Sequence, residues 1–511
     1  MSERARIAFY LDFGAGMGLG HLIRSSALAT ALELHRAQTC LVTASDISAL
    51  HVAIGAFDEV VAVGDGAWDE RLPAGLDWLV VDHYGPDPRC LERLRPLCRS
   101  ELRIVDSPSQ DTGRASLIVD QSLGAVPAEE RAPRTRLVTR FLVGPDYALL
   151  RPAFAMRRPA AARNDRSKPI SRVLIAPGAT DACGLVPELL RLLSEREIDV
   201  VLALSSLAGT IADVRAAVAA SSGRFALLED ADDAAMASAI AGADVVIGNA
   251  GGGSFERLAL GAPTVLALMA DNQRPNSQSL IKAGVAVDGG DARLPGAAEG
   301  IIAALDALAA DPAKRAAMSR AAFAVCDGLG AFRVALAMLP ERARDGRAVE
   351  LRRASAEDGE RILEWQSDPE TRRYSRDPTP PTREGHRDWM AKSLADPKRI
   401  LSLIEAGGEP CGGLRLDASD PEGPHVTYEV SINVAPGFDG QSIGRAALRA
   451  AGRLVPFAVL TASVREDNEK SLGLFKSAGY IETGREPVDP RFVTFALSPL
   501  RAPEKGTHHD A

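Results

Sequence analysis

The stretch GAGMGLGHLIRSSALATAL, residues 14–32, follows directly on the apolar run ARIAFYLDF at residues 5–13. The run predicts a buried strand, the glycines a tight loop, and the spacing after them a helix. Glycines let the backbone approach a ligand closely, and the free N–H groups at a helix start favour an anion. The helix dipole disfavours a charged imidazole at His21, so we expect a neutral base there, with Arg24 orienting the loop or a phosphate. A role for His21 in capping or packing alone fits the stretch equally well.

Composition indicates a globular chain with more than one domain. The 511 residues exceed what one hydrophobic core supports, and they are 46% apolar and 25% charged. The net charge of −9 gives no basic footprint, so we expect neither a nucleic-acid partner nor a membrane partner. No apolar run approaches the roughly 20 residues of a membrane helix, and the N-terminus is not typical of a signal peptide.

The cysteines are scattered and form no C-x-x-C pair, which disfavours a disulfide framework or a zinc site. They are Cys40, Cys90, Cys98, Cys183, Cys326 and Cys411. We therefore expect a reduced, cytoplasmic enzyme without a metal.

The first two thirds of the chain alternate short apolar runs with helical stretches, which predicts parallel sheets covered on both faces. At residues 158–169, RPAAARNDRSKP, a polar segment bracketed by prolines is typical of a linker. The chain thus predicts two Rossmann-like α/β lobes, residues 1–157 and 168–345, with a ligand cleft between them. The expected strands are 5–13, 39–44, 78–84, 102–107 and 116–120 in the first lobe, and 171–178, 199–205, 225–230, 244–249 and 264–270 in the second.

A second glycine turn lies in the stretch GNAGGGSFERLALGAPTVLALMADNQ, residues 248–273. A strand ends at Asn249 and a helix is expected from near Ser254, which would make a second anion cradle. Glu256 falls in the first helical turn, where the dipole stabilises a carboxylate, and it is also placed to hold two sugar hydroxyls. Turn glycines and a helix-start glutamate explain each residue alone. They explain less well why both lobes place such loops at equivalent strand ends.

The character of the chain changes after residues 340–349, PERARDGRAV. Residues 349–500 predict a third, mixed α/β domain. Its strand-like runs lie at 399–405, 425–435, 457–464 and 492–497, with helical stretches between them.

Together these features resemble the two-lobed glycosyltransferase-B superfamily, and residues 5–340 are similar to the UDP-sugar hydrolases of pseudaminic acid biosynthesis. The stretches that carry the resemblance are GLGHLIRSSALA (18–29), LVVDHYGPD (79–87), LVGPDYALLRPAF (142–154), PGATDACG (177–184), GGGSFERLALGAP (251–263) and DNQ (271–273). The glycine, serine and glutamate element at residues 251–256, GGGSFE, is by itself shared with many UDP-sugar glycosyltransferases. The resemblance implies metal-independent cleavage of UDP-2,4-diacetamido-2,4,6-trideoxy-β-L-altropyranose at its anomeric carbon, with inversion.

The resemblance also implies roles for the matching residues. His21 would activate the attacking water, and Asp82 and Tyr84 would line the sugar side of the cleft. The other matching positions are Gly252, Gly253 and Ser254 for the diphosphate, Glu256 for the ribose, Asn272 and Gln273 for the diphosphate or sugar, and Gly18, Gly20, Arg24 and Tyr147 for the substrate. The chain departs from its relatives at Gly178–Ala179, where a double glycine is usual, and at Asp106–Ser107, where two aspartates are usual.

The third domain resembles the GNAT family of acyl-CoA-dependent N-acetyltransferases through the stretches at residues 349–373, 427–450 and 463–484. The resemblance implies acetyl-CoA as cofactor and Glu429 as a base acting through water. The implied cofactor-binding positions are Val434, Gln441, Ser442, Ile443, Gly444, Asn468 and Ser471. Where the family has a basic or amide residue, a glycine and a tyrosine, this chain has Asp439, Ser442 and Phe475. A degenerate domain kept for packing or sugar binding is the alternative.

The fusion fits a two-step scheme in which the third domain acetylates the 4-amino group of a UDP-sugar and the two lobes then remove UDP. Other functions stay open at this point. The alternatives for the lobes are a glycosyltransferase that passes the sugar to an acceptor, a non-catalytic sugar-nucleotide sensor, and a UDP-N-acetylglucosamine epimerase. UDP binding, turnover and the stereochemistry of the product would separate these functions.

Overall fold

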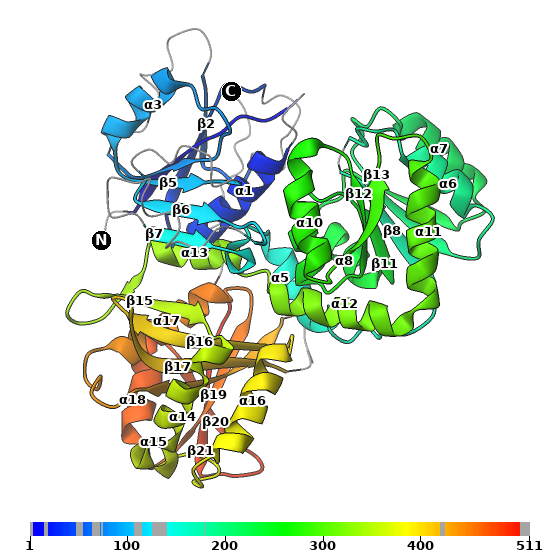
Figure 1. Ribbon diagram of the computed structural model, residues 1–511. Coiled ribbons are helices and arrows are strands. Elements are labelled where there is room, and N and C mark those ends of the chain that lie inside the picture. Colours follow the sequence, from blue (N-terminus) through cyan, green and yellow to red (C-terminus); the bar gives the residue numbers. More distant parts are fainter. Residues whose placement is uncertain are drawn as a thin grey trace. The chain divides into compact units, whose positions relative to one another are not determined.

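The computed structural model describes residues 4–14, 19–46, 55–63, 72, 75–106, 115–124, 140–178, 180–419 and 425–500. The chain divides into two compact units (Figure 1). One consists of Met1–Thr30 and Ala37–Ala331, and the other of Ala31–Arg36 and Phe332–Ala511.

The first lobe is built on a parallel sheet with the strand order β3-β2-β1-β4-β5-β6-β7. Strand β1, Arg6–Tyr10, is buried along almost its whole length, which is why the sequence there is one apolar run. The strands are β1 Arg6–Tyr10, β2 Gln38–Thr43, β3 Glu59–Ala62, β4 Leu76–Val81, β5 Cys98–Ile104, β6 Leu117–Asp120 and β7 Arg140–Val143. The helices include α1 Gly20–Glu33, α3 Pro88–Leu94, η2 Arg95–Leu97 and η4 Pro145–Tyr147.

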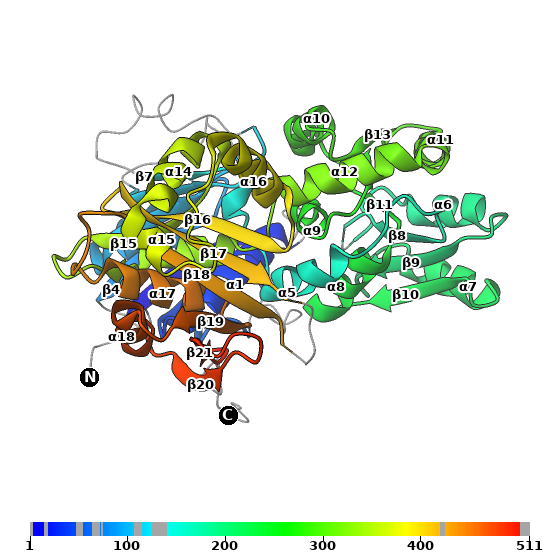
Figure 2. The ribbon, with the colours of Figure 1, turned by 90° about the horizontal axis from the view of Figure 1, so that it is seen from below.

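The second lobe repeats this plan with the parallel strand order β10-β9-β8-β11-β12-β13. Successive residues of one strand, such as Val173 and Leu174, belong to different hydrophobic clusters, so both faces of the sheet are covered by helices (Figure 2). The strands are β8 Arg172–Ala176, β9 Asp199–Leu204, β10 Phe225–Glu229, β11 Val245–Gly248, β12 Thr264–Leu268 and β13 Val287–Asp291. The helices are α5 Pro152–Ala161, α6 Val186–Leu193, α7 Ile211–Ala220, α8 Asp233–Gly242, α9 Gly253–Ala259, η5 Asp271–Gln273, α10 Arg274–Lys282, α11 Ala297–Ala310 and α12 Pro312–Val325. The next helix, α13 Gly330–Met338, belongs to the other compact unit from Phe332 onward.

The predicted pair of Rossmann-like lobes is confirmed, and the shared strand order locates their functional edges. In each sheet the order reverses beside the first strand, between β1 and β4 and between β8 and β11. Parallel α/β sheets bind ligands outside the carboxyl ends of the strands at such a switch point. The loops after β1, β4, β8 and β11 are therefore the places to look for a site.

The linker predicted at residues 158–169 is wrong. Helix α5 runs through Ala161, and the Arg158 guanidinium is buried, donating to the carbonyls of Ala259 at 2.9 Å, Cys326 at 2.8 Å and Phe323 at 2.8 Å. Arg166 is also buried and donates to the Ala241 carbonyl at 3.1 Å. These arginines satisfy carbonyls at helix ends, which have no partner within their own helix. Polar composition here indicates structural hydrogen bonding.

The third domain is built on a mixed sheet with the order β14-β15-β16-β17-β18-β19-β21-β20. Only β18 and β19 among these neighbours pair in parallel, and their ladder ends at Glu429 and Thr461, although both strands continue. The strands are β14 Glu341–Arg342, β15 Ala348–Arg353, β16 Arg399–Ala406, β17 Glu409–Ala418, β18 Thr427–Val434, β19 Val459–Arg465, β20 Ile481–Arg485 and β21 Phe492–Leu497. The helices are η6 Ala356–Asp358, α14 Gly359–Ser367, α15 Pro369–Arg373, α16 Arg383–Ala395, α17 Ile443–Leu454 and α18 Glu469–Ala478.

One stretch departs from the expectation that no segment approaches the length of a membrane helix. Pro312–Met338 is long and apolar enough to cross a membrane by length and composition, but 78% of its most apolar window is buried inside the protein. It comprises α12 and α13, and α12 residues Ala322 and Phe323 belong to a core cluster of the second lobe. Core helices of this kind pass the same test, so the stretch is weak evidence for a membrane span.

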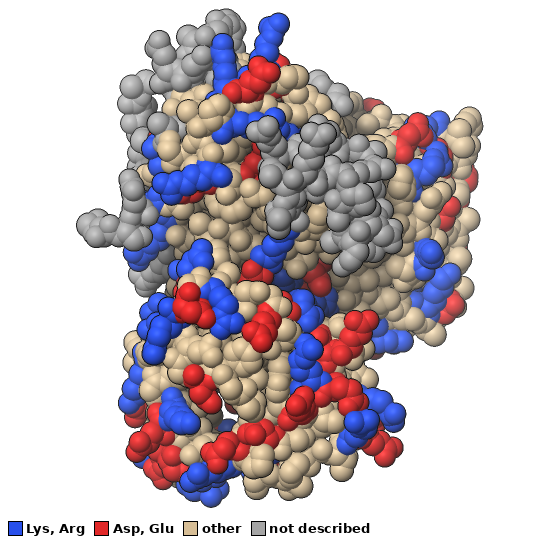
Figure 3. All heavy atoms as spheres, turned by 60° about the vertical axis from the view of Figure 1, so that its left-hand side comes forward, with Lys and Arg blue, Asp and Glu red and all other residues tan. Residues whose placement is uncertain are grey.

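Charged side chains of both signs are interspersed on the face of the molecule seen in Figure 3. Together with the net charge of −9, this mixture gives no reason to infer a nucleic-acid surface on that face. The absence of nucleic-acid and membrane partners stays a prediction.

Candidate functional site

The carboxyl ends of β1 and β4 bring His21 and Asp82 into direct contact. His21 is the second residue of α1, which follows the glycine loop, and Asp82 directly follows β4. The His21 Nδ1 and Asp82 Oδ1 atoms are 2.6 Å apart. His21 is 4% exposed and Asp82 is fully buried. The two residues thus form a buried imidazole–carboxylate pair at the switch point of the first sheet.

The Asp82 carboxylate is ionised and fixes the tautomer of His21. Burial alone would raise the pKa of Asp82, but the charge of Arg24 and the hydrogen bonds from Arg24 and His21 hold it well below its ordinary value. An ionised carboxylate only accepts hydrogen bonds, so the proton of His21 lies on Nδ1. Among the described residues, Nε2 has no hydrogen-bond partner. Nε2 is therefore the nitrogen of this ring that is open to a substrate or a water.

Arg24 orients this pair. Its Nε donates to Asp82 Oδ2 at 2.8 Å, its Nη2 donates to Asp82 Oδ1 at 2.5 Å, and its Nη1 donates to Asp106 Oδ1 at 2.6 Å. Ser25 Oγ adds a fourth hydrogen bond to Asp82 at 3.0 Å. The Arg24 guanidinium is thus bound to two carboxylates, and its expected role toward the loop or a phosphate stays a prediction.

Tyr84 is the exposed member of the cluster. Tyr84 is 53% exposed, and its hydroxyl donates to Asp106 Oδ2 at 2.9 Å. Its ring packs edge-on against the His21 ring, with 4.6 Å between the ring centroids. Partial burial of the hydroxyl and the charge of Asp106 raise the pKa of Tyr84 to about 12. Asp82 was expected to line the sugar side with Tyr84, but it is buried behind His21 and cannot contact a substrate in this arrangement.

His83 lies between these two residues in sequence and has a different role. Its Nε2 is 3.0 Å from Asp12 Oδ2, and its Nδ1 accepts from the Gly85 N–H at 2.9 Å. Both ring nitrogens are thus used, and the ring stacks on Tyr10. His83 ties the loop after β4 to the end of β1, so of the two neighbouring histidines His21 is the one with a free nitrogen.

The switch point of the second sheet is closed by Asn249. Its Nδ2 donates to the Pro177 carbonyl at 2.8 Å and its Oδ1 accepts from the Gly251 N–H at 3.0 Å, which joins the loops after β8 and β11. Gly178 has φ +120°, and a Cβ there would lie 2.9 Å from Asn249 Nδ2. The loop after β8 thus needs a glycine at this position, and the chain has one.

The predicted diphosphate residues follow directly. Gly252 is the N-cap of α9, Gly253 begins it, and the Ser254 hydroxyl donates to the Gly251 carbonyl. Glu256 is in the first turn of α9, but its Oε1 accepts from Arg151 Nη2 at 3.1 Å. Arg151 lies within the stretch 142–154, but nothing in the sequence indicates its contact with Glu256.

The remaining predicted positions of the first two lobes are more scattered. Asn272 is exposed in η5, and Gln273 Oε1 accepts from the Met269 N–H at 3.3 Å. Tyr147 is partly buried in η4, and Gly20 is the first residue of α1. Gly18 lies outside the described residues. The cleft expected between the two lobes stays a prediction.

In the third domain, Glu429 lies where the β18 and β19 strands separate. In register it stands beside Asp417 of β17 and Thr461 of β19, and its side chain is exposed. Beyond Glu429 and Thr461 the facing edges of the two strands no longer pair with each other. An extended group that carries amides fits such an opening, because it can bond to both free edges.

The loop after β18 leads into α17 through a left-handed Ser442, with φ +64°. Gln441 is held by the turn between β14 and β15, because its Oε1 accepts from Arg347 Nη2 at 2.7 Å. A Cβ on Gly444 would lie 3.2 Å from side-chain atoms of Val434 and Leu474, so this glycine permits close packing. Ile443 is buried in the same turn. A left-handed backbone favours glycine, the residue that the resemblance leads us to expect at this position, over the serine that the chain has.

Helix α18 begins at the predicted pair Asn468 and Ser471. Asn468 Oδ1 accepts from the Ser471 N–H at 3.1 Å, which is an N-cap bond. Phe475 is buried and packs edge-on against Tyr480. The buried hydroxyl of Tyr480 has no hydrogen-bond partner among the described residues, and burial raises its pKa.

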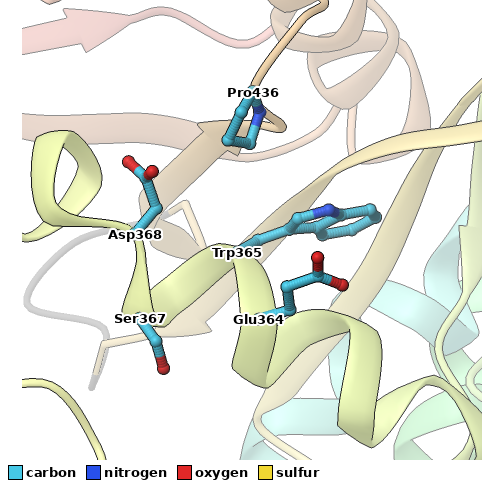
Figure 4. Close-up of a pocket in the computed structure, with 5 residues that line it drawn as sticks. All are labelled: Glu364, Trp365, Ser367, Asp368 and Pro436. Carbon is cyan, nitrogen blue, oxygen red and sulfur yellow. The ribbon is translucent and has the colours of Figure 1, made fainter.

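A cavity of about 360 Å³ opens between α14 and the segment after β18 (Figure 4). It is lined by Glu364, Trp365, Ser367, Asp368 and Pro436. Over the described ranges, no group of three or more His, Cys, Asp or Glu side chains is arranged to hold a metal ion.

Two parts of the chain match known families. Residues 348–481 match the acetyltransferase (GNAT) domain, and residues 232–330 match the glycosyltransferase family 28 C-terminal domain. The first match agrees with the predicted cofactor, acetyl-CoA, because GNAT domains are acyl-CoA-dependent.

Curated relatives match part of the chain. One is the UDP-N-acetylglucosamine–N-acetylmuramyl-(pentapeptide) pyrophosphoryl-undecaprenol N-acetylglucosamine transferase of Sorangium cellulosum. It is 37% identical over 234 residues, which are 43% of this chain and 54% of the relative. Another is an uncharacterized protein of Methanocaldococcus jannaschii, 24% identical over 277 residues, 53% of this chain and 57% of the relative. The aligned parts span little more than half the length of these relatives.

Solved structures resemble a part of the chain. An aminoglycoside acetyltransferase in complex with coenzyme A shares 16% identity over 30% of this chain and 95% of its own, with a TM-score of 0.27. A ribosomal L7/L12 alpha-N-protein acetyltransferase in complex with coenzyme A shares 17% identity over 29% of this chain and 93% of its own, with a TM-score of 0.27. On the family matches, the chain carries a GNAT acetyltransferase domain in its C-terminal part, preceded by a glycosyltransferase-B-like lobe of the family 28 type.

Proposed function

We propose that the first two lobes hydrolyse a UDP-sugar at its anomeric carbon, with His21 as the general base. The observation that carries this proposal is the 2.6 Å contact between His21 Nδ1 and Asp82 Oδ1, which leaves Nε2 as a free proton acceptor at the switch point. A positioned imidazole that is oriented by a carboxylate is well suited to activate water. The exposed Tyr84, which packs against His21, supplies a surface for the sugar.

In the proposed reaction, His21 Nε2 takes a proton from water as the water oxygen attacks the anomeric carbon. The bond from that carbon to the diphosphate oxygen breaks, and UDP leaves with the electron pair. Backbone N–H groups of the turn at Gly252 and Gly253 are placed to stabilise the charge on the leaving group. Attack from the side opposite the leaving group inverts the anomeric centre.

We propose UDP-2,4-diacetamido-2,4,6-trideoxy-β-L-altropyranose as the substrate of this step. Support comes from the combination of G-x-G-H-x-x-R with D-H-Y, whose residues His21, Arg24, Asp82 and Tyr84 form one bonded cluster in the structure. A shared cluster of this kind supports a shared reaction more strongly than it supports one particular sugar.

We propose that the third domain acetylates the 4-amino group of the UDP-sugar that the lobes later cleave. Acetyl-CoA supplies the acetyl group, and the separation of β18 from β19 offers free backbone groups to hold it. Glu429, at the point of separation, would receive the proton of the attacking amine through a water. The cavity beside Trp365 and Pro436 is adjacent to the end of β18 and offers space for the acceptor.

A glycosyltransferase is the second candidate, and one observation favours it. The Sorangium cellulosum relative, at 37% identity over 234 residues, is by name an N-acetylglucosamine transferase. A transferase would need an acceptor in place of water, and it would use the same nucleotide turn.

UDP release separates these candidates. Purified full-length protein is incubated with the diacetamido UDP-sugar, without an acceptor and with a chelator present. Hydrolysis predicts UDP and free sugar from the wild type, loss of both in His21→Ala, and unchanged release in the control His425→Ala, which alters an exposed histidine of the third domain. An intact UDP-sugar that is consumed only after an acceptor is added would establish the transferase.

A further inference from the structure

Three charged side chains meet beside the glycine turn of the second lobe. Arg151, the N-cap residue of α5, donates from Nη2 to Glu256 Oε1 at 3.1 Å and from Nη1 to Asp233 Oδ1. Asp233 is the first residue of α8, and Glu256 lies in the first turn of α9. The Arg151 guanidinium also lies over the Phe154 ring, 5.5 Å from its centroid. One arginine thus joins two carboxylates that belong to different helices.

The two oxygens of Glu256 have different surroundings. Oε1 is bound to Arg151, whereas Oε2 has no hydrogen-bond partner among the residues that the structure describes. Oε2 lies 3.9 Å from where a Cβ of Gly253 would stand, so it borders the glycine turn. The side chain of Glu256 is 15% exposed, so this oxygen lies in a largely buried environment.

We propose that Arg151 is a positioning residue of the nucleotide site, which holds the Glu256 carboxylate by one oxygen so that the other can accept hydrogen bonds from the vicinal hydroxyls of a ribonucleotide. This inference rests on the proposed nucleotide function of the second lobe. It adds a role for the segment between the two sheets, residues 142–154, that is separate from the chemistry at His21.

The charges around Glu256 predict how its ionisation depends on each neighbour. Burial raises the pKa of Glu256, Arg151 and Arg257 lower it, and Asp233 raises it. Loss of the Arg151 charge therefore moves the protonation of Glu256 to higher pH. Loss of the Asp233 charge moves it to lower pH. A protonated Glu256 is a poorer partner for two hydroxyl donors, so nucleotide affinity follows this ionisation.

The test is calorimetric titration of the full-length protein with UDP and with 2′,3′-dideoxy-UDP between pH 5 and pH 8. The wild type is expected to bind UDP at least tenfold more tightly than the dideoxy nucleotide. In Arg151→Gln this ratio falls toward one at low pH, and the pH at which UDP affinity is half lost moves upward. Arg151→Lys, which keeps the charge, restores part of the ratio, and Asp233→Asn moves the midpoint downward.

The control Arg215→Gln removes an arginine from a more exposed ion pair of the same lobe, with Glu229, and should change neither quantity. The inference is overturned if Arg151→Gln keeps the wild-type ratio and pH profile, or if it loses both nucleotides equally at every pH. If Arg151→Gln does not fold, the reduced ratio expected of Arg151→Lys and the lower midpoint expected of Asp233→Asn decide the matter. A wild type that binds no UDP at any pH overturns the proposed nucleotide function, and this inference with it.

Discussion

Asp82→Asn is the substitution that most sharply separates stability from catalysis in the first lobe. Asp82 is fully buried and accepts from His21 at 2.6 Å, from Arg24 at 2.5 and 2.8 Å, and from Ser25 at 3.0 Å. Asparagine keeps the shape of the side chain but loses the charge, and it offers one accepting oxygen instead of two. Arg24 keeps Asp106 at 2.6 Å, so its charge is not left wholly unpaired.

The expected loss of stability follows from these contacts. Removing one partner of a buried ion pair costs about 3–5 kcal/mol, and the remaining Asp106 contact places the expected cost near the lower end, at about 3 kcal/mol. A change of about 1 kcal/mol moves the melting temperature of a large domain by roughly 2–4 °C, so we expect a decrease of roughly 6–12 °C.

The expected loss of activity has a different cause. The amide N–H of asparagine can donate to His21 Nδ1, which would move the imidazole proton to Nε2 and remove the base. General-base catalysis contributes about 10²–10⁴-fold, and kcat for UDP release should fall by about that factor. Asp82→Asn with a lowered melting temperature and a wild-type kcat would refute the role given to Asp82.

Glu101→Gln is the matched control. Glu101 is a buried carboxylate of the same sheet, 4% exposed, and accepts from Arg95 at 2.9 Å and from Arg103 at 2.7 Å. Its substitution should lower the melting temperature while kcat of the folded enzyme is kept.

The pH dependence of stability adds a check on Asp82. Because folding lowers the pKa of Asp82, its contribution to stability is present above the ordinary pKa of about 3.9. It is lost only as pH falls through the lower pKa of the folded state. The difference in stability between wild type and Asp82→Asn should thus stay constant from pH 8 to pH 5.

Three further predictions concern the sugar side and the third domain. Tyr84→Phe removes the hydrogen bond from Tyr84, which is 53% exposed, to Asp106. Thermal melts should show a change in the free energy of unfolding within about 1 kcal/mol, while KM for the UDP-sugar rises. An unchanged KM would show that Tyr84 is not part of the binding surface. Glu429→Gln should lower kcat of acetyl transfer by about 10²-fold or more without changing KM for acetyl-CoA. In the control Glu482→Gln, which alters an exposed residue of β20, neither kcat nor KM should change. Equal effects of the two substitutions would contradict a base at Glu429. Gly412→Ala would place a Cβ 2.3 Å from the Asn433 carbonyl oxygen and should destabilise the third domain. Gly473 lies inside α18 with open space around it, so Gly473→Ala should stabilise the domain by about 0.5–1 kcal/mol. Denaturant unfolding in which both substitutions change the free energy of unfolding in the same direction would contradict the packing described.

The elements that could be predicted from sequence are those whose pattern reflects burial on both faces. β1, β4, β8 and β12 appear as continuous apolar runs, because a parallel strand between two helical layers has no solvent side. β13, Val287–Asp291, was missed because its sequence VDGGD is polar and rich in glycine. The sequence offers no apolar run there, and pairing with β12 determines the strand.

Site residues could be predicted where a local motif holds them and could not where distant segments meet. His21 and Arg24 lie one helical turn apart, and the motif around Asp82 indicated a partner for them, but only the structure shows Asp82 buried behind His21. Arg151 and Glu256 are 105 residues apart, and no periodicity connects them. The polar segment at residues 158–169 has the composition of a linker, and composition does not show that its buried arginines bond to helix-end carbonyls.

The central claim is that His21 activates water for attack at the anomeric carbon. The most direct measurement is turnover of the diacetamido UDP-sugar in ¹⁸O-labelled water, with the position of the label read by mass spectrometry. The account predicts that the wild type places the label in the free sugar and none in UDP, and that His21→Ala forms neither product at a measurable rate. Label in UDP would show attack at phosphorus, and wild-type turnover in His21→Ala would show that His21 is not the base; either result contradicts the account.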